Sequence, residues 1–306
     1  MIVVVSSALK NSLIKEFNVP SRKIIMLPNA VDPDKFYPIN INEDLRKEYG
    51  IKKNNVVGFI GGFYPWHGLS LLIDAAEEVI KALPKTKFIL IGDGPEREML
   101  IHRVKGSNLE KSIIFTGSVP HEKLQGYISL FDIGVMPDSN EHGSPMKIFE
   151  YMAMGKPTIA PRLSTLEDVV KDGLNGVLFE PKNKGDLSRV IIRVLTDEEF
   201  YDELSINSIE GIIKKHTWVK NAENILDRFN LLNDKEENTS VTFIVQYFYP
   251  EVASTAQLMT ELAKGLVKKG LKVKALVGQP TYVKSATLPK IENINGIEIE
   301  RLSCTR

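Results

Sequence analysis

Cysteine is almost missing from this chain of 306 residues, which contains only Cys304. A single cysteine excludes a disulfide framework and a cysteine-based metal site, and it fits a reducing, cytoplasmic environment. Long hydrophobic runs are lacking too: no stretch reaches about 18 apolar residues, so no transmembrane helix is expected. The apolar opening Met1–Ser6 is too short for a signal peptide and lacks a basic start.

The sequence also has no excess of charge of either sign. Lys plus Arg number 39, and Asp plus Glu also number 39. This balance argues against a protein whose main partner is nucleic acid. The hydrophobic content of 43% and the charged content of 25% are typical of a folded globular protein, and the length is enough for roughly two domains.

Short apolar runs alternate with amphipathic helical segments along most of the chain. The runs predict strands at Ile2–Val5, Lys23–Leu27, Val56–Ile60, Lys87–Ile91, Ser112–Phe115, Ile133–Met136, Thr158–Ala160 and Gly176–Phe179. The amphipathic segments predict helices at Gly68–Leu83, Pro95–Val104, His121–Phe131 and Lys184–Leu195. Apolar strands separated by helices predict an α/β fold, with a Rossmann-like parallel sheet and helices on both of its faces.

Ligands of such a sheet bind beyond the carboxyl ends of its strands. The loops that follow strands are therefore candidate binding loops. They are Gly61–Gly68, Gly92–Pro95, Gly117–Pro120, Pro137–Pro145 and Pro161–Ser164. Glycine or proline marks each of these loops, so together they predict a wide ligand site at one edge of the sheet.

A second unit is predicted after residues 233–240, a polar and charged segment with the composition of a linker. Val241–Tyr247 then predicts a strand, Thr255–Lys269 a helix, Leu271–Val277 a strand and Ile297–Leu302 another strand. This pattern is the beginning of a second Rossmann-like unit. It is about half as long as an ordinary α/β domain.

The segment Glu141–Pro157 carries the strongest local signal. Its small-residue loop Gly143–Pro145 leads into a helix that ends at Gly155. Such a loop presents backbone N–H groups at the positive end of a helix, which is a geometry that binds phosphate. Lys147 and Glu150 lie three residues apart and share one face of this helix. The alternative interpretation is an amphipathic helix with an ordinary capped start.

Four segments, in chain order, resemble motifs of one enzyme family. They are Leu27–Asp32, Gly61–Gly68, Gly92–Pro95 and Gly143–Ala153. In these segments the chain is similar to the retaining glycosyltransferases of the GT-B fold, in the large family four. The last segment resembles a variant common among bacterial surface-polysaccharide enzymes.

The resemblance implies a transferase that moves a sugar from a nucleotide-diphosphate sugar to a glycan or lipid-linked acceptor, with retention of configuration. It implies no metal and no cofactor besides this donor substrate. Two alternatives stay open. One is a nucleotide-sugar-binding fragment or gene fusion product without turnover, because catalysis needs both substrates positioned together. The less favoured alternative is a nucleotide-sugar epimerase of the same fold.

The resemblance also implies roles for single residues. Glu150 would accept hydrogen bonds from the ribose hydroxyls, which suits a carboxylate facing a vicinal diol. Where the family usually has a glutamate that contacts the donor sugar, this chain has His142, with Glu141 just before it. Lys147 would stabilise the leaving diphosphate. Glu141, His142 and Lys147 are therefore the catalytic candidates.

The rest of the donor site follows from the same resemblance. The residues expected to bind the nucleotide sugar are Gly61, Gly62, His67, Ser118, Val119, Gly143, Ser144, Pro145, Met146 and Glu150. Gly62 and His67 stand where the family commonly has an Arg and a Lys. A protonated His67 is one candidate for replacing that charge, and Arg162 is a weaker one. Trp66 is expected to pack between domains rather than to stack on a sugar.

The predicted domains follow an unusual order. Residues 1–38 resemble the end of an acceptor domain with its linker, and residues 39–218 resemble a donor domain. A C-terminal helix and polar linker occupy 219–240, and 241–306 resemble the beginning of an acceptor domain. Because the middle of an acceptor domain is absent, we expect a fusion or truncation rather than a circular permutation.

Basic residues are frequent in the last segment. They are Lys264, Lys268, Lys269, Lys272 and Lys274. A basic face can attract anionic lipids, which would bring a cytoplasmic protein to the inner face of the membrane by peripheral contact. A solvated helix face is the interpretation that the sequence favours.

Overall fold

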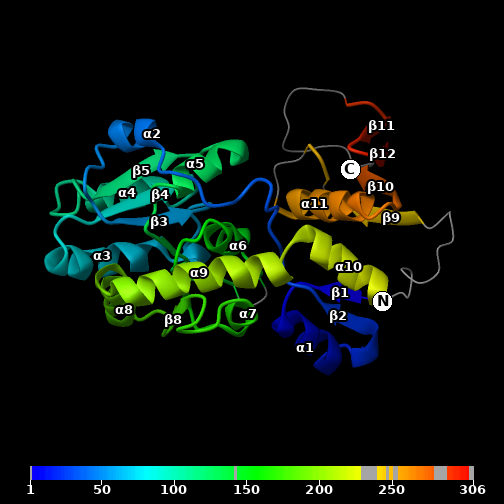
Figure 1. Ribbon diagram of the computed structural model, residues 1–306, viewed down its shortest axis with the longest axis horizontal. Coiled ribbons are helices and arrows are strands. Elements are labelled where there is room, and N and C mark those ends of the chain that lie inside the picture. Colours follow the sequence, from blue (N-terminus) through cyan, green and yellow to red (C-terminus); the bar gives the residue numbers. More distant parts are fainter. Residues whose placement is uncertain are drawn as a thin grey trace. The chain divides into compact units, whose positions relative to one another are not determined.

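The computed structural model describes residues 2–140, 143–228, 240–245, 248–250, 254–278 and 288–302 (Figure 1). The chain divides into two compact units, Met1–Ile213 and Lys214–Arg306. None of the helices in the described residues is long and apolar enough to cross a bilayer.

A six-stranded sheet, parallel throughout, forms the centre of the first unit. Its strands are β3 (Val56–Ile60), β4 (Lys87–Ile91), β5 (Ile113–Gly117), β6 (Ile133–Val135), β7 (Thr158–Pro161) and β8 (Val177–Phe179). Their order is β5-β4-β3-β6-β7-β8. The chain winds outward from β3 to β5, returns to the other side of β3, and continues to β8. The reversal between β3 and β6 is a topological switch point, where a ligand crevice is expected.

Helices flank this sheet on both faces (Figure 1). They are α2 (Glu43–Glu48), α3 (Leu69–Ala82), α4 (Arg97–Val104), α5 (Leu124–Ile128), α6 (Met146–Ala153), α7 (Ser164–Glu167), α8 (Lys184–Thr196) and α9 (Glu198–Lys215). In α3 the buried residues include Leu69, Leu72, Ile73 and Ala76, at the spacing of one helix face. The fold class predicted from the sequence is confirmed.

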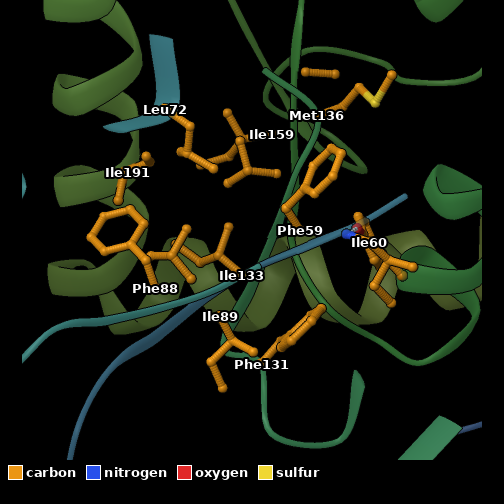
Figure 2. Packing of buried hydrophobic residues seen from close by; sticks show 14 of the residues in the cluster. Phe59, Ile60, Leu72, Phe88, Ile89, Phe131, Ile133, Met136, Ile159 and Ile191 are labelled. Carbon is orange, nitrogen blue, oxygen red and sulfur yellow. Dashed lines mark hydrogen bonds between the residues drawn. The ribbon is translucent and has the colours of Figure 1, made fainter. Parts of the chain in front are cut away.

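The core lies where strands β3, β4 and β6 meet the helices. Phe59, Phe88 and Ile133 come from these strands, and they pack with Leu72 of α3 and Ile191 of α8 (Figure 2). Every residue of β3 is buried, because the sheet is covered on both faces. Full burial explains why the strands read as continuous apolar runs in the sequence.

Two glycines at the switch point allow aromatic rings to pack directly against the sheet. Gly58 of β3 is paired in register with Gly134 of β6. A Cβ atom at Gly58 would lie 2.2 Å from the ring of Phe131, and one at Gly134 would lie 2.3 Å from the ring of Tyr151. The two rings meet edge to face, with their centroids 5.9 Å apart. Tyr151 belongs to α6, so this contact brings α6 down onto the central strands.

The chain begins with a small strand–helix–strand element in the first unit. β1 (Ile2–Val4) and β2 (Ile24–Met26) form a two-stranded parallel sheet, and α1 (Ser7–Lys15) connects them. The backbone N–H of Ser7 donates a hydrogen bond to the carboxylate of Asp168, at 2.7 Å. This bond ties the beginning of α1 to the end of α7.

The second unit has its own sheet and core. Its elements are α10 (Trp218–Arg228), β9 (Ser240–Val245), α11 (Ser254–Lys268), β10 (Lys272–Gly278), β11 (Ile291–Ile294) and β12 (Ile297–Leu302). The sheet order is β11-β12-β10-β9, with β9, β10 and β12 parallel. β11 is antiparallel to β12. Asn295 and Gly296 make the hairpin between them, both with positive φ, as a type I′ turn requires.

The structure refines several predicted elements. The helix predicted over His121–Phe131 is a 3-10 turn, η3 (His121–Lys123), followed by the short α5. Phe131 lies beyond the end of α5, with its ring packed on Gly58. β11, whose exposed and half-buried residues alternate, was not among the predicted strands. The four predicted domain boundaries stay predictions.

Substitution of Gly134 by Ala tests the packing of the Tyr151 ring against Gly134. The added methyl group would overlap a fully buried ring, so we expect a loss of about 1–3 kcal/mol in the free energy of unfolding. Gly185→Ala is the matched control, because a Cβ atom there meets only Asn183 Oδ1 at 3.6 Å. Urea denaturation measures both variants, and equal stability of the two would contradict the packing described.

Candidate functional site

A buried hydrogen bond anchors helix α6 to the central strand. The backbone N–H of Ile60, at the carboxyl end of β3, donates to the hydroxyl oxygen of Tyr151 at 2.7 Å. Residues from Lys147 to Ala153 are all buried. The helix therefore presents Lys147 and Glu150 at the switch point from a rigid element.

The loop before α6 is held by a second contact from far away in the sequence. The backbone N–H of Asn29 donates to Ser144 Oγ at 3.0 Å, and the Asn29 side-chain amide donates to the Ser144 carbonyl at 2.5 Å. Pro145 occupies the N-cap position, with α6 starting at Met146. Because proline has no polar side chain, Pro145 cannot cap the first backbone N–H groups of α6 itself.

Lys147 is buried beside the loop that follows β3. Its side chain Nζ lies 4.5 Å from the centroid of the Phe59 ring, a cation–π contact. A Cβ atom at Gly61, where φ is +147°, would lie 2.7 Å from Nζ. Glycine at this position therefore makes room for the ammonium group. Burial lowers the pKa of Lys147 to about 7, although the nearby Glu150 carboxylate acts in the opposite direction.

His67 contacts the same aromatic ring. Its ring meets that of Phe59 edge to face, with centroids 5.8 Å apart. Its Nδ1–H donates to the carbonyl of Gly62, which leaves Nε2 as an acceptor. Burial, and then the charge of Lys147, lower the pKa of His67 to about 4. In this structure His67 is therefore neutral at pH 7 and does not supply the protonated cation considered from the sequence.

Glu150 is held by a residue that the sequence analysis did not select. Its side chain is almost fully buried, and Oε1 accepts a hydrogen bond from His121 Nε2 at 3.0 Å. His121 opens the turn η3, directly after the loop that contains Ser118 and Val119. Ser118 is exposed, whereas Val119 is half-buried against the core. The position of His121 directly after a loop that follows a strand was the signal that could have identified it.

The loops after β3 and β4 lie against each other, backbone to backbone. The N–H of Gly61 donates to the carbonyl of Ile91, and the N–H of Gly92 donates to that of Gly117, both at 2.9 Å. A Cβ atom at Gly92 would lie 1.9 Å from the Gly61 carbonyl oxygen. Only glycine at position 92 permits this approach.

The structure thus brings many of the predicted site residues to one place. Contacts among them join Gly61, Gly62, His67, Lys147 and Glu150, with Gly143, Ser144, Pro145 and Met146 leading into α6. Glu141 and His142 lie outside the described residues. Within the described part of the chain, no three His, Cys, Asp or Glu side chains come together in a way that could hold a metal ion.

Arg162 and Trp66 are the two weaker candidates. The Arg162 guanidinium pairs with Asp172 at 2.5 Å, and Glu167 and Glu180 lie 3.7 Å from it. Three carboxylates therefore offset its charge at the surface. Trp66 is half exposed and stacks on Tyr64, with centroids 4.6 Å apart and ring planes 7° from parallel.

A family model described as "Glycosyl transferases group 1" matches residues 41–211. A curated relative is an uncharacterized glycosyltransferase of Methanocaldococcus jannaschii, 27% identical over 72% of this chain and 56% of its own length. The Escherichia coli UDP-Gal:alpha-D-GlcNAc-diphosphoundecaprenol alpha-1,3-galactosyltransferase is 28% identical over 72% of this chain and 57% of its own length. The chain therefore spans little more than half the length of these relatives.

Solved structures share the fold. Anabaena HepE in complex with UDP and glucose aligns with a TM-score of 0.67 and 21% identity, covering 75% of this chain and 62% of that one. The C-terminal domain of a group 1 glycosyl transferase from Francisella tularensis aligns with a TM-score of 0.56 and 24% identity. That alignment covers 61% of this chain and 99% of the Francisella domain. At these identities the comparison concerns the fold alone.

Lys147→Met tests the burial of the lysine through the pH dependence of stability. With a pKa near 7 when folded and near 10.5 when unfolded, Lys147 binds more protons in the unfolded chain between those pH values. Stability of the wild type should therefore rise with pH across this window, and the methionine variant should lack that rise. Urea denaturation at pH 7 and pH 9 measures the difference. The same slope in both proteins would contradict the burial of Lys147.

Proposed function

The chain belongs to the glycosyl transferases group 1 family, and from this premise we propose that its first unit is the donor half of a retaining glycosyltransferase of family four. The donor is a nucleotide-diphosphate sugar, and the acceptor is a glycan or a lipid-linked acceptor. The observation that carries the proposal is the placement of Lys147 and Glu150 on one rigid helix at the switch point.

The two side chains suit the two polar parts of a nucleoside diphosphate. Glu150 accepts hydrogen bonds from the ribose hydroxyls, and the carboxylate geometry matches a vicinal diol. Lys147 and the first backbone N–H groups of α6 hold the diphosphate. Gly61 and Gly62 let this group approach the backbone closely. The main chain at Ser118 and Val119 holds the base, and Glu141 and His142 contact the donor sugar.

The positive charge of Lys147 matters most when the sugar leaves. The bond between the anomeric carbon and the diphosphate oxygen breaks, and charge builds up on the diphosphate. A new bond forms from the acceptor oxygen to the same face of the sugar, and the acceptor proton passes to the leaving phosphate. A diphosphate beside Lys147 also favours the charged ammonium, so donor binding is accompanied by proton uptake.

Two similar proteins support the choice of substrates. The HepE structure is a complex with UDP and glucose. The Escherichia coli relative is named for UDP-Gal as its donor and for a diphosphoundecaprenol as its acceptor carrier. A cytoplasmic enzyme acting on such an acceptor works at the inner face of the membrane.

Peripheral membrane contact through the lysines of the second unit has less support. Lys264 pairs with Glu261 at 2.8 Å, and Lys274 with Glu298 and Glu300 at 3.0 and 2.9 Å. Lys269 is paired with Glu223. Carboxylates that lie beside these cations offset their attraction to anionic lipids, which favours a solvated face.

Incubation with UDP-glucose, UDP-galactose, UDP-GlcNAc and GDP-mannose tests the proposal, with mass spectrometry of the products. The wild type should transfer or hydrolyse at least one donor, and Glu150→Ala should weaken binding of the corresponding nucleoside diphosphate about 10- to 100-fold, as expected for lost bonds to a charged group. Glu77→Gln, an exposed position of α3, is the control and should behave as the wild type.

Each result separates the candidate functions. Nucleoside diphosphate binding in calorimetry without transfer or hydrolysis would favour the binding fragment. Failure of every donor and every nucleoside diphosphate to bind would contradict the proposed function altogether.

A further inference from the structure

The Glu150 carboxylate has one oxygen engaged within the protein. Its side chain is 4% exposed, and Oε1 lies 3.0 Å from His121 Nε2. Because a carboxylate oxygen accepts, Nε2 must carry the hydrogen of this bond. A buried carboxylate needs such a donor, since its desolvation is otherwise costly.

The imidazole ring of His121 is in turn packed against a buried aromatic ring. Phe36 is 4% exposed, and its ring meets the imidazole edge to face, with centroids 5.4 Å apart. Phe36 is placed by a turn in which its N–H donates to the Asp32 carbonyl at 3.0 Å. The His121 side chain is 37% exposed, so one part of the ring faces solvent while the rest is fixed. Three segments that are distant in the sequence thus converge on one carboxylate.

We propose that His121 is a positioning residue for nucleotide binding: it fixes Glu150 by the bond to Oε1 and thereby directs Oε2 toward the ribose diol. This inference rests on the proposed function. The terminal torsion of a glutamate is soft and has no sharp preferred angle. One hydrogen bond to a packed ring removes that freedom before the nucleotide binds. Nucleotide binding then involves no further loss of conformational entropy in the Glu150 side chain.

The role is specific to the ribose, and this separates it from a general structural effect. Loss of the Nε2–H donor should weaken only those ligands whose 2′ and 3′ hydroxyls reach Glu150. A 2′,3′-dideoxynucleoside diphosphate lacks both hydroxyls, so its affinity should not depend on His121. A variant that merely loosens the fold would weaken both ligands equally.

Calorimetry with two matched ligands tests this. The probes are whichever of UDP, GDP and ADP the wild type binds most tightly, and its 2′,3′-dideoxy analogue. His121→Ala should weaken the ribonucleotide about 10-fold, as expected for one lost bond to a charged group, and leave the dideoxy analogue unchanged. His121→Gln, which restores an N–H donor, should recover most of the affinity. His102→Ala, an exposed histidine in α4, is the control and should match the wild type.

A second variant controls for the effect of His121→Ala on folding. His121→Phe keeps an aromatic ring against Phe36 without a donor, and it should reproduce the ribose-specific loss. Wild-type affinity in both His121→Ala and His121→Phe, together with a loss in Glu150→Ala, would overturn this inference and leave the proposed function intact. An equal loss for both ligands would also overturn it. Absence of nucleotide binding by the wild type would contradict the proposed function itself.

Discussion

The site depends on the packing of α6 against the central strands β3 and β6. Tyr151 packs against Gly134, and its hydroxyl accepts a hydrogen bond from the last backbone N–H of β3, that of Ile60. Because the ring and the hydroxyl fix the helix together, Lys147 and Glu150 have little freedom to move. The switch point between β3 and β6 is where a ligand is expected to bind, and Tyr151 holds the helix that carries Lys147 and Glu150 there.

This arrangement carries a cost in stability that a bound anion would offset. Lys147 is buried against Phe59, and its pKa falls to about 7 because the charged form loses its hydration. His67 shares the same ring and stays neutral. A methionine would fill the place of Lys147 without this penalty. A buried cation beside a glycine loop and a helix N-terminus suits an anion that restores its charge.

Much of the fold could be predicted from the sequence. The strands of the first unit are buried on both faces and therefore form continuous apolar runs. β3 and β4 occupy the ranges that their apolar runs predicted. His121 was missed because its role depends on contact with Phe36 and Glu150, which only tertiary packing brings together. The neutral state of His67 was missed for a similar reason: its burial and the charge of Lys147 are properties of the folded protein.

A crystal structure of the protein with a bound nucleoside diphosphate would show whether Lys147 and Glu150 hold the nucleotide. We expect a diphosphate oxygen within hydrogen-bond distance of Lys147 Nζ and both ribose hydroxyls beside the Glu150 carboxylate. We also expect the His121–Glu150 bond to persist. A nucleotide bound elsewhere on the protein, or one whose ribose points away from Glu150, would contradict the account.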